Sequence, residues 1–317
     1  MSLQMKNINL MVNDYCNNKC QMCNIWQNAT PTDLSVARVQ KLFAHETFRH
    51  LEEVSITGGE PFMHRNLLGV ADAILSSLPL LKKLFINSNG MYPGKLVSFC
   101  HFCVTRVQEL TLCFSLEGPR DVNRIIRGVD TYPLVLQSLG VIQRFREHSP
   151  KVRAKISSTL QPGNSSVEVV AHLLDLADEY DADFTFRFVH KSTLYYQNEN
   201  SADSLDISKE EKLKILDYVV QRKGPDQFID VLRDYIQTGY CSPLQTSEKE
   251  LICKAGELFS FIQANGEILP CLFSTRVIGN IEEGITNPVQ GDLGKFESCP
   301  CCSECHVFPM LTYLPQV

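Results

Sequence analysis

The sequence predicts an α/β fold built on a parallel sheet with helices on its outer side. Apolar runs that suit strands alternate with segments of helical periodicity from Asn7 to about His190. Six strand–helix repeats of this kind indicate a parallel sheet. Most of these strands end in small or polar residues. In parallel α/β proteins the functional site lies at that end of the strands, so we expect it there.

The individual elements follow from periodicity and from start and stop signals. We expect strands at Asn7–Asn13, Leu51–Thr57, Lys83–Asn87, Val107–Ser115, Val152–Leu160 and Asp183–Val189. We expect the helices between them at Leu34–Phe48, Leu67–Leu78, Lys95–Phe102, Tyr132–Arg146 and Ser166–Tyr180. Two more helices are expected after the polar stretch Tyr195–Asp206, at Ser208–Gln221 and Asp226–Gln237. A hairpin that turns at Asn265 and Gly266 follows them.

Composition is that of a globular protein and excludes several other classes. The chain has 317 residues, 44% of them hydrophobic, and a formal net charge of −6. Its Lys and Arg residues are dispersed, whereas nucleic-acid-binding proteins carry a basic face. No apolar run approaches the ~18 residues of a membrane span. The 13 cysteines occur without a secretory signal, which favours a reducing compartment and metal ligation. We therefore expect a cytoplasmic protein without nucleic-acid or membrane partners.

The most informative motif is the triplet Cys16, Cys20 and Cys23, spaced C-x3-C-x2-C, just after the first predicted strand. Four nearby cysteines would complete a zinc site or a fully ligated iron–sulfur site. Three thiolates leave one iron of a four-iron cluster open to bind another molecule. The alternative is three buried or zinc-binding cysteines.

Further motifs follow at the ends of later predicted strands. The second strand ends at Gly58, Gly59, Glu60 and Pro61, and the next two end in the segments LKKLFINSNG and ELTLCFSLEGP. Together with the cysteine triplet, these motifs resemble the radical S-adenosylmethionine (SAM) superfamily over most of the chain. That family carries CxxxCxΦC after its first strand, where Φ is apolar and is Met22 here, and GGEP after its second strand. The resemblance implies a partial (β/α)6 TIM-like barrel.

The resemblance also implies the cofactors. In the family, the residues matching Cys16, Cys20 and Cys23 bind three irons of a 4Fe-4S cluster, and SAM chelates the fourth iron. Reductive cleavage of SAM then gives a 5′-deoxyadenosyl radical, which abstracts hydrogen from the substrate. The electron would come from an external donor of the flavodoxin or ferredoxin type. Gly58 and Gly59 would allow close approach of the methionine amino group, because a side chain there would collide with it. Glu60 would accept from that ammonium group, directly or by holding the strand end.

Other residues at the strand ends are candidates for binding SAM. Ribose hydroxyls need hydrogen-bond donors and acceptors, and we assign Ser115 and Glu117 to them. Arg127 in RIIRG matches the place of an arginine that holds the SAM carboxylate in relatives; the alternative is a surface arginine. The remaining cofactor-binding candidates are Met22, Ser88, Asn89 and Ser158. Ser158 is alternatively a satisfied core hydroxyl.

Arg187 is the one charged residue in the otherwise apolar centre of the last predicted strand. Period-two alternation places Phe184, Phe186 and Phe188 on one face and Arg187 on the other. An arginine inside the barrel is costly unless it meets an anion. We therefore predict that Arg187 contacts substrate or cofactor, with a structural ion pair as the alternative.

A second set of cysteines, near the C-terminus, resembles the twitch domain, a truncated form of the SPASM auxiliary-cluster domain. The predicted metal ligands are Cys253, Cys271, Cys302 and Cys305, and Cys299 or Cys301 could replace Cys302. Their arrangement is similar to that of radical SAM dehydrogenases of the 2-deoxy-scyllo-inosamine type. It implies a second, auxiliary 4Fe-4S cluster, and a zinc site is the alternative. Cys241 is a spare thiol that could donate hydrogen in an epimerisation. We expect Cys100, Cys103 and Cys113 to be ordinary buried residues.

These motifs divide the chain into three regions and leave three functions open. We expect a barrel at residues 1–195, a helical extension at 196–240 and a twitch-like domain at 241–317. The favoured function is dehydrogenation or epimerisation of a small polyhydroxylated substrate, such as a sugar or aminocyclitol. A peptide-modifying radical SAM enzyme is the first alternative. The early first strand and the short C-terminal cysteine region favour the small substrate. A non-catalytic iron–sulfur electron carrier is the second alternative, and such a carrier would need no GGEP turn.

Overall fold

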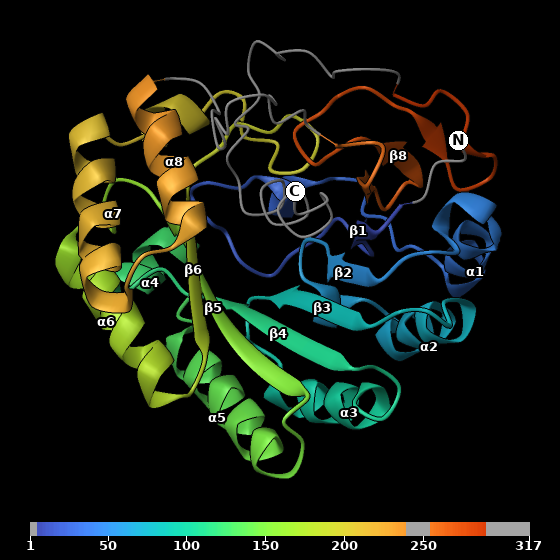
Figure 1. The fold of residues 1–317 in the computed structure, drawn as a ribbon, viewed down its shortest axis with the longest axis horizontal. Coiled ribbons are helices and arrows are strands. Elements are labelled where there is room, and N and C mark those ends of the chain that lie inside the picture. The colour runs from blue at the N-terminus through green and yellow to red at the C-terminus, as the bar shows by residue number, and fades with distance from the viewer. Residues whose placement is uncertain (1–4, 239–253, 290–317) are drawn as a thin grey trace.

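A computed structural model describes residues 5–238 and 254–289, and one sheet runs through both ranges (Figure 1). The strands are β1 (Asn7–Met11), β2 (Glu53–Thr57), β3 (Lys83–Ser88), β4 (Glu109–Ser115), β5 (Val152–Leu160), β6 (Asp183–Phe188), β7 (Phe259–Ile262), β8 (Glu267–Leu269), β9 (Gly279–Asn280) and β10 (Gly284–Ile285). Strands β1 to β6 lie side by side in chain order and all run parallel. This arrangement confirms the predicted parallel α/β fold, a partial TIM-like barrel.

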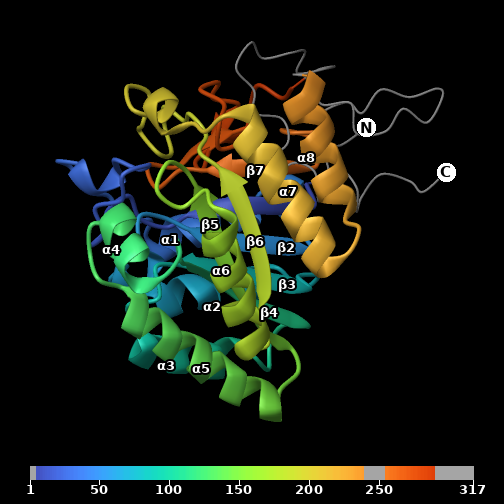
Figure 2. The same ribbon diagram turned by 90° about the vertical axis from the view of Figure 1, so that its left-hand side faces the viewer.

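Helices cover the outer side of this sheet, as Figures 1 and 2 show. They are α1 (Val36–Ala44), α2 (Leu67–Ser77), α3 (Pro93–Cys103), α4 (Arg120–Arg127), α5 (Tyr132–His148), α6 (Val167–Glu179), α7 (Lys209–Lys223) and α8 (Gln227–Thr238). Short 3-10 turns lie at Ile25–Gln27, Glu46–Phe48, Pro61–Met63 and Ala202–Leu205. A capping box begins α7, because Ser208 accepts from the Glu211 amide and Glu211 accepts from the Ser208 amide. Helix α4 was not expected from the sequence.

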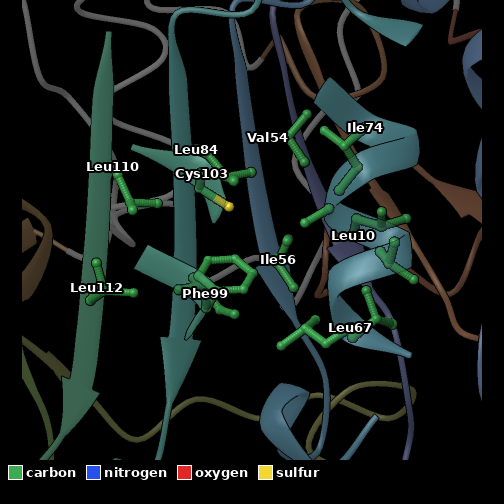
Figure 3. Close-up of a cluster of buried hydrophobic side chains, with 14 of the residues drawn as sticks. Leu10, Val54, Ile56, Leu67, Ile74, Leu84, Phe99, Cys103, Leu110 and Leu112 are labelled. Atoms are coloured by element: carbon green, nitrogen blue, oxygen red, sulfur yellow. The ribbon is translucent and has the colours of Figure 1, made fainter. Parts of the chain in front are cut away.

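The two faces of the sheet differ sharply in polarity. Figure 3 shows Val54 and Ile56 of β2 packed with Leu84 and Phe99 in the layer between sheet and helices. These side chains are at most 1% exposed, and burying each stabilises the fold by about 1.5–3 kcal/mol. Cys100 and Cys103 of α3 belong to the same core, as expected. Because side chains alternate along a strand, the residues between these apolar ones face the barrel interior.

The far edge of the half-barrel is covered by α7 and α8, which Figure 2 shows beside β6. Phe186 and Phe188 of β6 share a core with Ile215 and Leu216 of α7 and with Ile229 of α8. This confirms the predicted outward face of the phenylalanine stripe. It also leaves Thr185 and Arg187 on the interior face.

On the other edge, the C-terminal strands extend the barrel sheet. Strand β7 pairs parallel with β1, Asn7 opposite Phe259, and β8 to β10 continue as antiparallel strands. The predicted hairpin turn is confirmed: Gly266 has φ +93°, and an added Cβ would lie 1.9 Å from Nη2 of Arg38. That arginine donates to the Asn265 carbonyl at 2.9 Å, and His45 contacts the Ile281 carbonyl at 2.9 Å. Helix α1 therefore holds this extension against the barrel.

Two further observations concern the cysteines and the helices. Within residues 5–238 and 254–289, Cys16, Cys20, Cys23, Cys100 and Cys103 are free thiols. Within the same ranges, no helix is long and apolar enough to cross a membrane.

Candidate functional site

The interior of the half-barrel holds a cavity of about 560 Å³. Its lining runs from the cysteine loop at the C-terminal ends of the strands to the first residues of β2, β3 and β4. Many of the lining side chains carry hydroxyl or carboxamide groups: Asn7, Asn9, Ser55, Thr57, Asn87, Thr111, Ser115, Ser157, Thr159 and Thr185. The interior of a complete TIM barrel is packed with branched apolar side chains. The polar lining here therefore marks a binding chamber.

Cys16, Cys20 and Cys23 line one end of this cavity. Their loop is fixed from both sides: the Gln21 amide donates to the Ile126 carbonyl at 2.9 Å, and the Asn198 carboxamide donates to the Met22 carbonyl at 3.0 Å. Burial raises the pKa of Cys16 to about 11 and that of Cys23 to about 12. These thiols would therefore become thiolates only with a bound metal.

Among the described residues, no three His, Cys, Asp or Glu side chains are placed to hold a single metal ion.

The GGEP segment continues the pairing of β2 along the cysteine loop. The Gly59 amide donates to the Asn13 carbonyl and the Glu60 amide to the Tyr15 carbonyl, both at 2.9 Å. A Cβ on Gly58 would lie 2.2 Å from the Asn13 side-chain oxygen, and one on Gly59 would lie 2.0 Å from the Tyr15 carbonyl oxygen. From the sequence, glycine was expected to be needed here for close approach of a ligand. The structure places that need at the cysteine loop, which packs directly on these residues.

Glu60 holds three backbone segments together. Its carboxylate accepts from the Phe62 amide at 3.0 Å, the Ser88 hydroxyl at 2.9 Å and the Asn89 amide at 2.6 Å. The side chain is fully buried and is not among the residues that line the cavity. Burial raises its pKa, and these donors oppose that rise. Of the two expected roles, the geometry matches the holding of the strand end.

Ser88 and Asn89 act in the same bracing network. Ser88 also accepts from the Gly90 amide at 3.0 Å. The Asn89 carboxamide donates to the Asn17 side-chain oxygen at 2.7 Å, which ties the end of β3 to the cysteine loop. Neither residue is among those that line the cavity. The structure therefore places both behind the cysteine loop instead of in contact with a ligand in the cavity.

Glu117 and Arg127 form a buried ion pair beside the thiols. Nη1 of Arg127 lies 2.8 Å from the Glu117 carboxylate, and both side chains line the cavity. Arg127 is 7% exposed, which excludes the surface alternative. Burial disfavours its charge, but Cys20 and Glu117 outweigh that effect and raise the pKa of Arg127. The Asn18 carboxamide, oriented with its oxygen towards Arg127, accepts from Nε at 3.0 Å.

The structure does not place Ser158 at the cavity. Its hydroxyl is fully buried and donates to Glu117 at 3.1 Å, so the alternative of a satisfied core hydroxyl holds. The pleat of β5 turns Ser157 and Thr159 to the cavity instead. Ser115 and Met22 do line the cavity, as expected of cofactor-binding residues.

Arg187 faces the cavity beside two tyrosines of the segment after β6. Its Nη1 donates to the Tyr196 hydroxyl at 3.1 Å, and Tyr195 and Tyr196 make edge contact at 4.7 Å between ring centroids. The Tyr195 hydroxyl lies 2.5 Å from the Thr57 hydroxyl at the end of β2. The interior position of Arg187, expected from alternation, is confirmed.

A profile of the Radical SAM superfamily matches residues 10–176, which is more than half of the chain. The chain belongs to the radical SAM superfamily. The family implies a 4Fe-4S cluster and SAM as cofactors. The site fits both, because three thiols lie at the rim of one cavity with a buried arginine beside them. No curated protein sequence matched the chain.

Solved structures agree on the fold. SuiB from Streptococcus suis, bound to S-adenosylmethionine, matches with a TM-score of 0.61 and 18% identity, over 89% of this chain and 64% of that one. Native anSMEcpe with bound AdoMet matches with a TM-score of 0.62 and 16% identity, over 88% and 79%. A radical SAM methyltransferase from Sphaerobacter thermophilus matches with a TM-score of 0.50 and 14% identity, over 76% and 69%. This chain thus spans 64% of the length of SuiB.

For this radical SAM chain, several predicted residues lie outside the described ranges. They are Cys241, Cys253, Cys299, Cys301, Cys302 and Cys305. The remaining member of the predicted auxiliary set, Cys271, lies just after β8. It is buried at 8% exposure in a small cluster with Ala255 and Phe259.

Sequence reasoning missed several residues that line the radical SAM cavity. Trp26 follows the third cysteine, and Glu53 and Lys155 face inward from β2 and β5. A signal was present for the last two, because strict alternation around Val54 and Ile156 places Glu53 and Lys155 on the inner face. Tyr195 and Tyr196 also line the cavity; they begin the polar stretch Tyr195–Asp206, which carries no recognisable motif.

Proposed function

We propose that this radical SAM enzyme abstracts hydrogen from a small polyhydroxylated substrate, such as a sugar or aminocyclitol, held inside the barrel. The observation that carries the proposal is the density of hydroxyl and carboxamide groups around the 560 Å³ cavity. Such groups both donate and accept hydrogen bonds, which suits a ligand with many hydroxyls. A chamber this polar would bind an apolar substrate poorly, because its groups would lose their hydration without gaining partners.

We assign the cofactor roles as follows. Cys16, Cys20 and Cys23 hold the 4Fe-4S cluster, which with bound SAM supplies the radical that removes a hydrogen atom. Arg127 binds the SAM carboxylate through a charge-assisted contact, held in place by Glu117. Ser115 and Glu117 face the ribose. Tyr195, Tyr196 and Thr57 enclose this end of the cavity and exclude water from it.

We propose dehydrogenation as the outcome, with epimerisation as the variant. A substrate that has lost a hydrogen atom becomes a carbonyl compound by losing one more electron and a proton. An auxiliary 4Fe-4S cluster on Cys253, Cys271, Cys302 and Cys305, in a twitch-like domain, would accept that electron. Epimerisation would instead need a hydrogen donor, and Cys241 is the candidate thiol. An external flavodoxin- or ferredoxin-type donor would supply the electron for SAM cleavage.

Peptide modification is the second candidate, and the printed descriptions of two matching structures support it. One matching structure is SuiB bound to precursor peptide SuiA, and another is native anSMEcpe with bound AdoMet and Cp18Cys peptide. A peptide side chain entering the same cavity would meet the same hydroxyl-rich walls. A simple electron carrier is disfavoured, because it needs no chamber beside its cluster.

The cysteine assignments are tested by iron and sulfide analysis after anaerobic reconstitution. Wild type should bind about eight irons per chain, and a Cys16→Ala, Cys20→Ala, Cys23→Ala triple variant about four. The triple variant should also lose SAM cleavage. Cys271→Ala should lose about half the iron and keep SAM cleavage. The matched control is Cys103→Ala, whose thiol lies in the α3 core and should leave iron unchanged.

Two outcomes would count against these assignments. SAM cleavage that persists in the triple variant would reject the catalytic cluster site. A wild-type content of about four irons with bound zinc would make the C-terminal cysteines structural and remove the electron acceptor.

A further inference from the structure

Glu53 is a carboxylate inside the barrel that has no hydrogen-bond or ion-pair partner in the described part of the chain. It is the first residue of β2, it is partly buried, and it lines the cavity. Throughout residues 5–238 and 254–289, nothing donates a hydrogen bond to its carboxylate, and no cation forms an ion pair with it. Removing such a charge from bulk water is costly unless a donor or cation meets it.

The neighbouring Glu52 shows what a structural carboxylate at this strand looks like. It points to the other side, where Lys6 lies 2.9 Å and Lys82 2.6 Å from its oxygens. These two lysines lower the pKa of Glu52, whereas burial raises the pKa of Glu53. Glu52, just before β2, and Glu53, its first residue, therefore occupy opposite environments.

Two amides accompany Glu53 on the inner wall formed by β1 and β2. Asn7 lies directly opposite Glu53 in the strand register, and Asn9 lies two residues further along β1 on the same face. Both side chains line the cavity, and neither carboxamide has a hydrogen-bond partner among the described residues. One carboxylate and two carboxamide oxygens thus offer acceptors to whatever enters.

The simplest alternative is a ring of alternating charges that closes the barrel floor. Register places Lys83 of β3 beside Glu53 and Glu109 of β4 beside Lys83. Glu109 does have partners, because it accepts from Thr111 at 3.3 Å and lies 3.9 Å from Arg153. Lys83 is exposed and forms no ion pair with Glu53 within 4.0 Å. The ring is therefore incomplete at Glu53.

We propose that Glu53, with Asn7 and Asn9, is a subsite for a protonated amino group of the substrate. An ammonium group donates three hydrogen bonds, which matches these three acceptors. Glu53 lies four residues before the end of β2, about 13 Å along the strand. The cysteine loop lies at the other end of β2, so the amino group binds far from the carbon that loses hydrogen. A substrate that reaches both points must be an extended molecule of about two sugar rings. This assignment rests on the proposed function and narrows its substrate to amine-bearing polyols.

A matched pair of probes tests the subsite in the reconstituted, SAM-loaded enzyme. The chitosan dimer carries amino groups where cellobiose carries hydroxyls, and binding is measured by calorimetry and by the fluorescence of Trp26, the one tryptophan of the chain, at the cavity wall. Wild type should bind the chitosan dimer about tenfold or more tightly than cellobiose. Glu53→Gln should reduce that ratio to about one. Glu52→Gln, which removes the same charge outside the cavity, should keep the wild-type ratio.

Three results would overturn the subsite: equal binding of the two probes to wild type, no binding of either, or an unchanged preference in Glu53→Gln. SAM cleavage is measured on the same samples. An amine preference without SAM cleavage would reject the proposed function and leave the subsite standing, so the two failures are distinguishable.

Stability against pH provides a second readout that needs no ligand. Burial raises the pKa of Glu53, and the negative charge of Glu109 adds to that rise, whereas Lys83 and Lys155 lower the pKa. Because the net change is a rise, ionisation of Glu53 opposes folding. Wild type should therefore lose stability relative to Glu53→Gln as the pH rises from below the ordinary glutamate pKa to above that of Glu53. At pH 8 the variant should be at least as stable as wild type. A variant less stable than wild type at pH 8 would show that Glu53 is a structural ion-pair partner and would overturn the proposal.

Discussion

The ion pair of Glu117 and Arg127 shows how single residues combine structure with a role at the cavity. One Glu117 oxygen accepts from Arg127, and the other accepts from the Ser158 hydroxyl and the Thr159 amide, at 3.1 Å and 2.8 Å. The pair thereby joins α4 to β5 beside the cysteine loop. A buried charge that loses its partner is far more costly than an exposed one, so this contact is sensitive to single substitutions.

We expect Arg127→Met to destabilise the apoprotein by about 3–5 kcal/mol, because Glu117 is then left buried without its counter-charge. Glu117→Gln combined with Arg127→Met should recover part of that loss. Urea unfolding followed by far-UV circular dichroism measures both, as a double-mutant cycle. The exposed Arg124, which lies 3.6 Å from Asp121, provides the control: Arg124→Met should change stability by less than about 0.5 kcal/mol. A loss below about 1 kcal/mol in Arg127→Met would contradict this account of the pair.

For single residues, the sequence predicted which side chains lie near the site better than it predicted their hydrogen-bond partners. The cysteines, Arg127, Ser115 and Arg187 are at the cavity, as motif position and alternation required. The other predicted strand-end residues form hydrogen bonds with protein groups instead; they are Glu60, Ser88, Asn89 and Ser158. A motif places a side chain at a strand end, but which of its neighbours supplies the donor depends on loops that pack from distant parts of the chain. The absence of a partner for Glu53 among the described residues likewise could not be predicted from the sequence.

At the scale of elements, the contact between the end of β2 and the cysteine loop is the tightest in the site. It consists of backbone pairing from Val12 to Tyr15 against the end of β2 and the GGEP turn. Such close approach of two backbones leaves no room for side chains, which explains two consecutive glycines. The loop that carries the thiols is therefore positioned by main-chain hydrogen bonds.

We expect Gly59→Ala to displace the cysteine loop, because the new Cβ would lie 2.0 Å from the Tyr15 carbonyl oxygen. The cost should be about 1–3 kcal/mol of stability, together with a clear loss of reconstituted iron. Gly94→Ala is the matched control: nothing lies within 4 Å of its added Cβ, and in α3 it should stabilise by about 0.5–1 kcal/mol. Iron content and thermal unfolding of the two variants check the comparison. Full iron in Gly59→Ala would show that the loop tolerates the shift.

Periodicity located the helices and strands well and their ends less well. The first strand stops at Met11 and not Asn13, because the chain leaves the sheet to form the cysteine loop. Helix α4 escaped prediction because it has only eight residues and follows Pro119 without a side-chain cap. Its position is fixed by the ion pair and by the cysteine loop, neither of which appears as a local pattern.

At the scale of the whole molecule, the sheet does not end where the predicted domains do. The expected boundary at 241 separates barrel from C-terminal region, yet β7 pairs with β1 along four residues. Phe261 of β7 packs against the Tyr195 ring at 5.4 Å and joins the cluster that includes Met11 and Ile25. The strand that follows the expected boundary thus forms one wall of the cavity. Sequence spacing cannot reveal this pairing, because β1 and β7 are about 250 residues apart.

A single cooperative unit is therefore expected to span the barrel and β7. Phe261→Ala should destabilise the whole molecule by about 3–5 kcal/mol, because it leaves a cavity between β1, β7 and Tyr195. Trp26 fluorescence reports on the cavity end of the barrel, and far-UV circular dichroism reports on all helices and strands. In urea both signals should shift together, in wild type and in the variant. The exposed Val277 of the same C-terminal segment is the control, and Val277→Ala should shift neither by more than about 0.5 kcal/mol. If the Trp26 signal kept its wild-type midpoint in Phe261→Ala while the circular dichroism shifted, β7 would be an independent unit, and the cavity wall it forms would not depend on the barrel.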